Sequence, residues 1–324
     1  MPACQEGSTP YLSIIIPVYN EEQNVYPLFE EITRAFHGYS HSYEIIFIDD
    51  GSTDQTRSIL QDICRRDKRV KCIIFQGNFG QTAALSAGFD LAKGELIVSL
   101  DGDRQNDPAD IPRLLSIIED QGYDVVCGWR RKRKDSFWTR RLPSLMANRL
   151  IALVTGVFIH DYGCTLKAYR KEILKRIRLY GEMHRFIPAY VSWAGAKVTE
   201  VEVNHRYRVA GHSKYNLFRT FKVMLDLITV KFLCDYSTSP IYFFGTFGIF
   251  LCGSGLLFAV ITLVEKFYRG VWVHRNPLIL LAIFLFIIGV QCIMIGLLAE
   301  IMIRTYHESQ GKKTYIIREV ISTS

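Results

Sequence analysis

Asp101 and Asp103 stand two residues apart, directly after the apolar run Leu96 to Leu100. Carboxylates in such a place attract a hard divalent cation, which keeps further positions open for phosphate oxygens and water. A turn or a helix cap explains a bare Asp-x-Asp pair equally well. The apolar run before the pair favours the metal interpretation, because ligands of an open α/β sheet bind beyond the carboxyl ends of its strands.

Polar residues also close two earlier apolar runs. The sequence PVYNEE stands at residues 17–22, and DDGSTD stands at residues 49–54. Asp50 is a candidate to accept hydrogen bonds from a base or a ribose. Ser52 is suited to cap the next helix, and the two roles are compatible.

Short apolar runs alternate with amphipathic stretches around these polar groups. Continuous apolar strands separated by helices predict a parallel sheet covered on both faces, as in a Rossmann-like α/β domain. A dinucleotide-dependent oxidoreductase and a P-loop NTPase are disfavoured, because the sequence has neither Gly-x-Gly-x-x-Gly after the first strand nor a Walker A motif. The expected strands are residues 12–17, 43–50, 70–76, 96–101 and 124–128, and the expected helices are 25–36, 53–66, 81–92 and 111–121.

Two C-terminal stretches, Ile241 to Val264 and Leu278 to Ala299, run for 24 and 22 residues without a charged side chain. Each is long enough to cross a hydrocarbon core of ~30 Å as a helix. The apolar pattern before them predicts an amphipathic helix at the membrane surface. We expect an α/β domain at residues 1–215, an amphipathic juxtamembrane segment at 216–240, two transmembrane helices at 241–303 and a cytosolic tail at 304–324.

The eight cysteines are scattered, with no Cys-x-x-Cys pair and no zinc-type spacing. We expect reduced thiols, which suit a cytosolic domain. The first ten residues are polar, and no signal peptide is visible. The expected location is an inner or plasma membrane, crossed twice, with the large domain and the tail in the cytosol.

Most of the net charge of +7 lies in one basic segment, residues 130–141, which contains seven Lys or Arg and one Asp. A solvated run of charge is one interpretation. Nucleic acid binding is disfavoured, because no stacking motif or recognition helix accompanies the segment. In a chain with transmembrane helices, the segment favours an anionic lipid or a phosphate-bearing membrane substrate.

Seven motifs occur in an order that resembles glycosyltransferase family 2, the inverting, metal-dependent nucleotide-sugar enzymes of the GT-A fold. They lie within residues 12–216 and read PVYNEE, DDGSTD, GNFGQTAALSAG, LDGDRQ, VVCGWR, DYGCTLKAY and HRYRVAGHSKYN. Together with the two apolar stretches they resemble the polyprenyl-phosphate branch, which contains dolichyl-phosphate mannosyltransferases and bactoprenol glucosyltransferases. The resemblance implies a GT-A domain followed by amphipathic interface helices and two transmembrane helices.

The resemblance also implies roles for residues at the matching positions. Those of the nucleotide-sugar pocket are Pro17, Tyr19, Glu21, Asp50 and Asp101. Those of a Mg²⁺ or Mn²⁺ site are Asp103 and Gln105, with Asp101 joining directly or through water. Those with a catalytic role are Asp161, Arg130 and Lys167, the last standing where the family has an arginine. Those that contact the donor diphosphate or the acceptor phosphate are Arg131, Arg133, Arg206, Arg208, Ser213 and Lys214.

The expected reaction is inverting transfer of a sugar, with UDP-glucose as the preferred donor, to a polyprenyl phosphate such as undecaprenyl phosphate. GDP-mannose and a UDP-aminopentose are alternative donors, and the resemblance implies a homotetramer. A processive polysaccharide synthase is disfavoured, because the sequence lacks its Gln-x-x-Arg-Trp motif. A catalytically silent scaffold that binds anionic lipid is the alternative of another class, and the intact acidic motifs argue against it.

Asp161 is either a structural carboxylate or part of the catalytic machinery. A phosphate acceptor has a second pKa of ~6, so it is mostly a dianion at neutral pH and needs little help from a base. We therefore expect Asp161 to act chiefly by positioning, through Lys167 or a neighbouring arginine, and only in part as a base.

Overall fold

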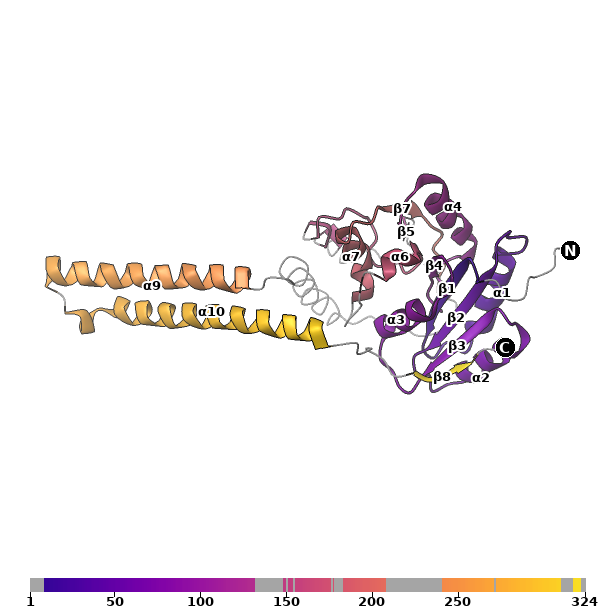
Figure 1. The fold of residues 1–324 in the computed structure, drawn as a ribbon, viewed down its shortest axis with the longest axis horizontal. Coiled ribbons are helices and arrows are strands. Elements are labelled where there is room, and N and C mark those ends of the chain that lie inside the picture. Colours follow the sequence, from indigo (N-terminus) through magenta and orange to yellow (C-terminus); the bar gives the residue numbers. More distant parts are fainter. Residues whose placement is uncertain are drawn as a thin grey trace. The chain divides into compact units, whose positions relative to one another are not determined.

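The computed structural model describes most of the chain (Figure 1). The described residues are 9–131, 148–149, 151–153, 155–175, 177, 183–207, 241–270, 272–309 and 317–321. The chain forms two compact units, one of residues 1–227 with 313–324 and the other of residues 228–312. The C-terminal residues therefore belong to the first unit, although the chain reaches them only after the second.

An eight-stranded sheet forms the centre of the first unit. Its strands are β1 (Leu12–Val18), β2 (Tyr43–Asp49), β3 (Val70–Phe75), β4 (Leu96–Ser99), β5 (Val125–Trp129), β6 (Lys167–Arg170), β7 (Val198–Glu202) and β8 (Ile317–Ile321). Its described helices are α1 (Val25–Ala35), α2 (Thr56–Arg66), α3 (Gln81–Leu91), α4 (Ile111–Gln121), α6 (Lys171–Leu174) and α7 (Ile187–Trp193), with 3₁₀ turns at Pro108–Asp110 and Met183–Phe186. All five strands and four helices expected before residue 130 are present, which confirms the α/β fold.

The strand order is β7-β5-β6-β4-β1-β2-β3-β8. As expected, β1 pairs in parallel with β2 and β4, and β2 with β3. However, β6 runs antiparallel between β4 and β5, and β8 runs antiparallel beside β3. The expectation of a wholly parallel sheet is therefore wrong on both sides of its centre. Four residues are too few to show a strand pattern in the sequence, which is why β6 was not predicted.

Helices cover both faces of the central strands. Ile14 and Ile16 of β1 pack with the apolar sides of α1, α2 and α4. On the opposite face α3 lies directly against the sheet, because Gly88 approaches the side chains of Ile15 and Ile48 and has no room for a Cβ. Nearly every residue of β1 and β2 is buried, and each buried Ile contributes ~2 kcal/mol to folding. This packing fixes where the carboxyl ends of β1, β2 and β4 lie.

Cys64 of α2 and Cys72 of β3 form a disulfide, so the expectation that all cysteines are reduced is wrong for this pair. The helix packs back on the neighbouring strand, which brings the two side chains together. Cys127 and Cys164 are free and buried. The thiol argument for a reducing compartment therefore no longer supports the cytosolic location.

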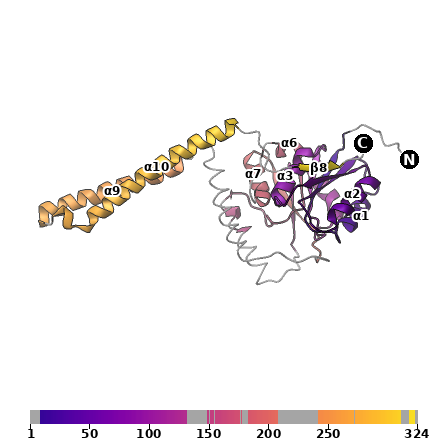
Figure 2. The same cartoon turned by 90° about the horizontal axis from the view of Figure 1, so that it is seen from below.

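Two long apolar helices make up the described part of the second unit. α9 (Ile241–Arg269) and α10 (Pro277–Ser309) run side by side in both views (Figure 1 and Figure 2). Their stretches Tyr242–Tyr268 and Pro277–Ala299 have mean hydropathies of 2.4 and 3.0 and are long enough to cross a membrane. The two expected spanning stretches are thus helical, whereas the expected amphipathic segment at 216–240 lies outside the described residues.

Glycines allow α9 and α10 to approach closely. A Cβ at Gly248 would lie 2.6 Å from the carbonyl oxygen of Gly289, and a Cβ at Gly255 would lie 2.7 Å from that of Ala282. Such contacts leave room for hydrogen only, so these glycines fix the pairing of the two helices. The pair is therefore an antiparallel hairpin joined through a turn at Val273–Arg275.

Because β7 and β8 belong to one sheet, any membrane crossings between them must be even in number. We expect Trp272→Cys, in the turn between α9 and α10, to react with an impermeant maleimide only from the side opposite to tags at Met1 and Ser324. Gly270 is unsuitable for the probe, because its φ of 67° strains any side chain. The unsubstituted chain controls for the native thiols, and labelling of Trp272→Cys from the side of the tags would contradict two full crossings.

Candidate active site

Side chains tie together the loops that follow β1 and β2. The backbone N–H of Asn20 donates to Ser52 Oγ at 2.9 Å, and the N–H of Thr53 donates to Asn20 Oδ1 at 2.8 Å. The N–H of Glu21 donates to Thr56 Oγ1, also at 2.9 Å. These bonds hold residues 53–55 in the loop, so α2 begins at Thr56, three residues later than expected.

Three residues of the expected nucleotide pocket lie at the carboxyl end of β1. Pro17 and Tyr19 are half-buried there. Glu21 is also half-buried, and its carboxylate accepts a hydrogen bond from Asn24 Nδ2 at 2.6 Å. The structure therefore gives Glu21 a structural role in its own loop, beside any contact with a ligand.

Asp50 organises the loop that precedes α3. Its two carboxylate oxygens accept the backbone N–H groups of Phe79, at 2.7 Å, and Gly80, at 2.9 Å. The side chain is 4% exposed, and these charge-assisted bonds offset the cost of burying it. Asp50 thus fixes the position from which α3 starts.

Gln81, the first residue of α3, reaches the metal-candidate motif. Its Nε2 donates to Asp101 Oδ1 at 2.7 Å. Sequence reasoning gave Gln81 no role, because the motif GNFGQTAALSAG reads as a loop and a helix. Its position in the sequence could have indicated a role, because Gln81 is a polar residue that follows a glycine-containing loop at the carboxyl end of β3.

Asp101, Asp103 and Gln105 follow β4 in a tight turn. Gly102 makes this turn possible, because a Cβ there would lie 2.6 Å from Val18 Cγ1. Asp103 is 8% exposed and accepts the N–H of Gln105 on Oδ1 at 3.2 Å. The turn therefore places two carboxylates and an amide within a few residues of one another.

This donor set fits a Mg²⁺ or Mn²⁺ ion. Both ions prefer oxygen ligands, and Mg²⁺ is commonly bound by one or two carboxylates together with substrate phosphates and water. Among the described residues, no three acidic, His or Cys side chains form a metal-binding group. Asp101, Asp103 and Gln105 would hold the ion with the phosphates of a bound nucleotide.

Arg130 and Asp161 form a buried, bidentate ion pair. Arg130 Nε lies 2.8 Å from Asp161 Oδ2, and Arg130 Nη2 lies 3.0 Å from Asp161 Oδ1. Their side chains are 15% and 4% exposed. Burial opposes the charge of the guanidinium, but the attractions of Asp161, Cys164 and Asp101, together with the hydrogen bonds to Asp161, outweigh it and raise the pKa of Arg130. The arginine that positions Asp161 is therefore Arg130.

Lys167 begins β6 and is almost completely buried. Its Nζ donates to the carbonyl oxygen of Tyr162 at 3.2 Å. Burial lowers the pKa of Lys167, while the nearby Cys127, Cys164 and Asp161 oppose that shift. An amine so poorly hydrated gains from any anion that enters its surroundings.

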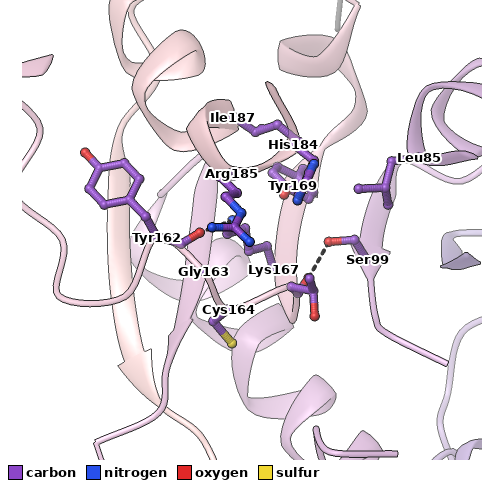
Figure 3. Close-up of a pocket in the computed structure, with 11 residues that line it drawn as sticks. Leu85, Ser99, Tyr162, Gly163, Cys164, Lys167, Tyr169, His184, Arg185 and Ile187 are labelled. Atoms are coloured by element: carbon purple, nitrogen blue, oxygen red, sulfur yellow. Dashed lines mark hydrogen bonds between the residues drawn. The ribbon is translucent and has the colours of Figure 1, made fainter. Parts of the chain in front are cut away.

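Lys167 lines a pocket between β4, β6, α3 and the 3₁₀ turn at Met183–Phe186 (Figure 3). His184 and Arg185 lie beside it near the centre of this view, and His184 Nδ1 hydrogen-bonds with Thr82 Oγ1 at 2.8 Å. The described lining residues include these basic side chains and no Asp or Glu. The space inside the pocket is about 10 Å³, which is room for about one water molecule.

The remaining predicted cations have different surroundings. Arg131 is exposed, pairs with Glu202 at 2.5 Å and lies over the ring of Trp129. Arg206 pairs with Glu31 and with Asp107, each at 2.7 Å. The structure thus places Arg206 in an ion-pair network at the turn after β4. The predicted phosphate contacts that lie outside the described residues are Arg133, Arg208, Ser213 and Lys214.

Known proteins are similar to this chain in sequence and in fold. The model of Glycosyl transferase family 2 matches residues 13–178. A dodecaprenyl-phosphate galacturonate synthase from Rhizobium johnstonii is 43% identical over 312 residues, which cover 95% of this chain and 92% of that protein. An undecaprenyl-phosphate 4-deoxy-4-formamido-L-arabinose transferase from Aeromonas hydrophila is 35% identical over 315 residues, 97% of this chain and 94% of that protein.

Glucosyl-3-phosphoglycerate synthase from Mycobacterium tuberculosis, crystallised with Mn²⁺ and UDP-glucose, has a similar fold. Its TM-score is 0.53 at 18% identity, and the match covers 69% of this chain and 79% of that one. At this identity the likeness concerns the fold alone.

A double-mutant cycle tests the Arg130–Asp161 pair. Removing one partner leaves a buried charge unpaired, which costs about 3 kcal/mol. We expect Arg130→Met and Asp161→Asn each to lower the thermal unfolding midpoint of the purified chain by about 6–12 °C. The double variant leaves no charge unpaired, so it should lose clearly less than the sum. Additive losses would contradict the pairing, and the exposed pair Asp62–Arg65 is the control, with a coupling below ~1 kcal/mol.

Proposed function

The chain belongs to glycosyltransferase family 2, and we propose that it transfers a sugar from a nucleoside-diphosphate sugar to a polyprenyl phosphate. The observation that carries the proposal is the turn of Asp101, Asp103 and Gln105 near the Arg130–Asp161 pair, close enough that Asp101 helps to raise the pKa of Arg130, in a chain with two candidate membrane spans. The Rhizobium and Aeromonas relatives are named for transfer to dodecaprenyl and undecaprenyl phosphate. A lipid acceptor also explains why a nucleotide-sugar enzyme would carry apolar helices.

The group that gains negative charge in the reaction is matched by positive charge at the site. An oxygen of the lipid phosphate attacks the anomeric carbon, the bond from that carbon to the donor diphosphate breaks, and the sugar inverts. A Mg²⁺ or Mn²⁺ ion would neutralise the diphosphate as it leaves. Asp103 and Gln105 would hold that ion, with Asp101 joining directly or through water, and Arg130 and Lys167 add positive charge nearby. Asp161 fixes the guanidinium of Arg130 through two hydrogen bonds.

The relatives differ in the sugar for which they are named. Sequence reasoning favoured UDP-glucose, with GDP-mannose and a UDP-aminopentose as alternatives. The Rhizobium relative, which is 43% identical to this chain, is named for galacturonate. We therefore propose UDP-linked uronic acid as the donor class.

We further propose that the catalytic domain faces the cytosol and that the chain forms a homo-oligomer, as the resemblance to the tetrameric branch implies. Basic residues support the orientation only weakly, with three between the helices and four in the tail. We also propose that the basic segment at residues 130–141 faces the membrane, where it meets the anionic lipid.

An assay with purified full chain, undecaprenyl phosphate and a divalent metal tests the function. We expect UDP release and a polyprenyl-phospho-sugar detected by mass spectrometry. A chelator should abolish both, and Mn²⁺ or Mg²⁺ should restore them. Asp103→Asn should lose most turnover, whereas Asp120→Asn, an exposed carboxylate on α4, should keep it. Normal turnover by Asp103→Asn would contradict the metal site, and no transfer from any donor would support a silent scaffold.

The donor class is tested in the same assay with UDP-galacturonate and UDP-galactose, which differ only in the carboxylate. We expect kcat/KM to be at least about tenfold higher for the uronate, a difference of ~1.4 kcal/mol. UDP-glucose, GDP-mannose and UDP-4-deoxy-4-formamido-L-arabinose complete the panel. Equal use of the matched pair, or preference for a neutral sugar, would contradict the acidic donor.

Asp161→Asn and Asp161→Ala distinguish positioning from base catalysis. Asn keeps an oxygen that Arg130 can donate to, so it should retain clearly more activity than Ala. Because the acceptor phosphate is already mostly a dianion above its second pKa of ~6, raising the pH should rescue neither variant. If both were equally inactive and recovered as the pH rises, Asp161 would be a general base.

A further inference from the structure

Arg104 lies between Asp103 and Gln105 and has a φ of 61°. This left-handed conformation is unfavourable for a residue with a Cβ, so a chain adopts it only where surrounding contacts hold it. It turns the backbone so that the N–H of Gln105 reaches Asp103 Oδ1. The arrangement of the two candidate ligands therefore depends on the conformation of the residue between them.

Glu31 of α1 supplies the contact that holds Arg104. Its Oε1 accepts from Arg104 Nη2 at 2.5 Å and from Arg104 Nε at 3.1 Å. The two side chains are 22% and 15% exposed, so water screens the pair only partly. The guanidinium reaches away from the turn to α1, and it anchors the turn to a helix of the core.

The other oxygen of Glu31 holds the same turn from its far side. Oε2 accepts from Arg206 Nη1 at 2.7 Å, and Arg206 Nη2 pairs with Asp107 at 2.7 Å. The backbone N–H of Arg206 also donates to the carbonyl oxygen of Gln105 at 2.8 Å. The carboxylate of Glu31 therefore fixes both Arg104, which precedes Gln105, and Arg206, whose backbone pairs with Gln105.

We propose that Glu31 is a positioning residue for the divalent metal and holds Asp103 and Gln105 in their binding arrangement through Arg104 and Arg206. The inference rests on the proposed function, which requires a metal at this turn. Glu31 lies outside all seven motifs, and nothing in the sequence connects it with the site. Groups that orient metal ligands are commonly worth 10–100-fold in metal affinity.

The dissociation constant of Mn²⁺ in the presence of UDP tests this role without turnover. It is measured on the full chain in detergent from the electron paramagnetic resonance signal of free Mn²⁺. We expect Glu31→Gln to weaken Mn²⁺ binding by about tenfold. Asp67→Asn is the matched control, because Asp67 forms a comparable ion pair with Arg69 at 2.6 Å away from the turn, and it should bind Mn²⁺ like the wild type.

Arg104→Gly separates positioning from a general loss of structure. Glycine adopts a positive φ without strain, so the turn would no longer need the carboxylate. Arg104→Gly should bind Mn²⁺ within about threefold of the wild type, and the double variant Glu31→Gln/Arg104→Gly should bind Mn²⁺ more tightly than Glu31→Gln alone, because only the contact with Arg206 is then missing. The rescue would not occur if Glu31 served only the stability of the domain.

Wild-type affinity in Glu31→Gln, or a double variant as weak as Glu31→Gln alone, would overturn the inference and leave the proposed function intact. A wild-type chain that binds no Mn²⁺ with UDP would overturn the metal site of the proposed function, and the inference with it.

Discussion

Negative charge gathered at one edge of the sheet is the constraint on which the rest of the site depends. Asp50, Asp103 and Asp161 are each less than a tenth exposed, and a buried carboxylate is costly unless it is paired or hydrogen-bonded. Nearby backbone and side-chain groups supply these hydrogen bonds and the ion pair. Backbone N–H groups before α3 bind Asp50, the N–H of Gln105 binds Asp103, and Arg130 binds Asp161. The loops of the site therefore have the conformations that these carboxylates require.

The same balance of charge suits a nucleotide sugar and a lipid phosphate. Carboxylates alone would repel a diphosphate, and a divalent ion at Asp103 and Gln105 would offset that repulsion. Arg130 directly follows β5 and Lys167 begins β6, and Asp161 limits how far the arginine can move. The carboxylates at the turn after β4 are thus separate from the cations that follow β5 and begin β6.

Local sequence patterns predicted the strands at the centre of the sheet, but they could not predict pairings between segments far apart in the chain. The runs at β1 to β4 predicted a parallel sheet because each is mostly apolar and is followed by a helix. β6 and β8 are short strands whose place depends on partners far along the chain, and neither was expected. The motifs placed Asp101 and Asp103 directly after a strand, and the structure confirms this. They left open whether Lys167 or an arginine pairs with Asp161, and the structure shows that the partner is Arg130. Arg206 was expected at a phosphate, yet it pairs with Glu31, 175 residues away, and no sequence periodicity reports such a contact. Gln81 was missed for the same reason.

Anomalous diffraction at the manganese edge, from crystals of the full chain grown with UDP and Mn²⁺, tests the account most directly. The account predicts one strong peak in contact with the side chains of Asp103 and Gln105 and with the diphosphate of UDP, and Arg130 still paired with Asp161. A peak bound elsewhere, or UDP bound at the carboxyl edge of the sheet with no metal at this turn, would contradict it.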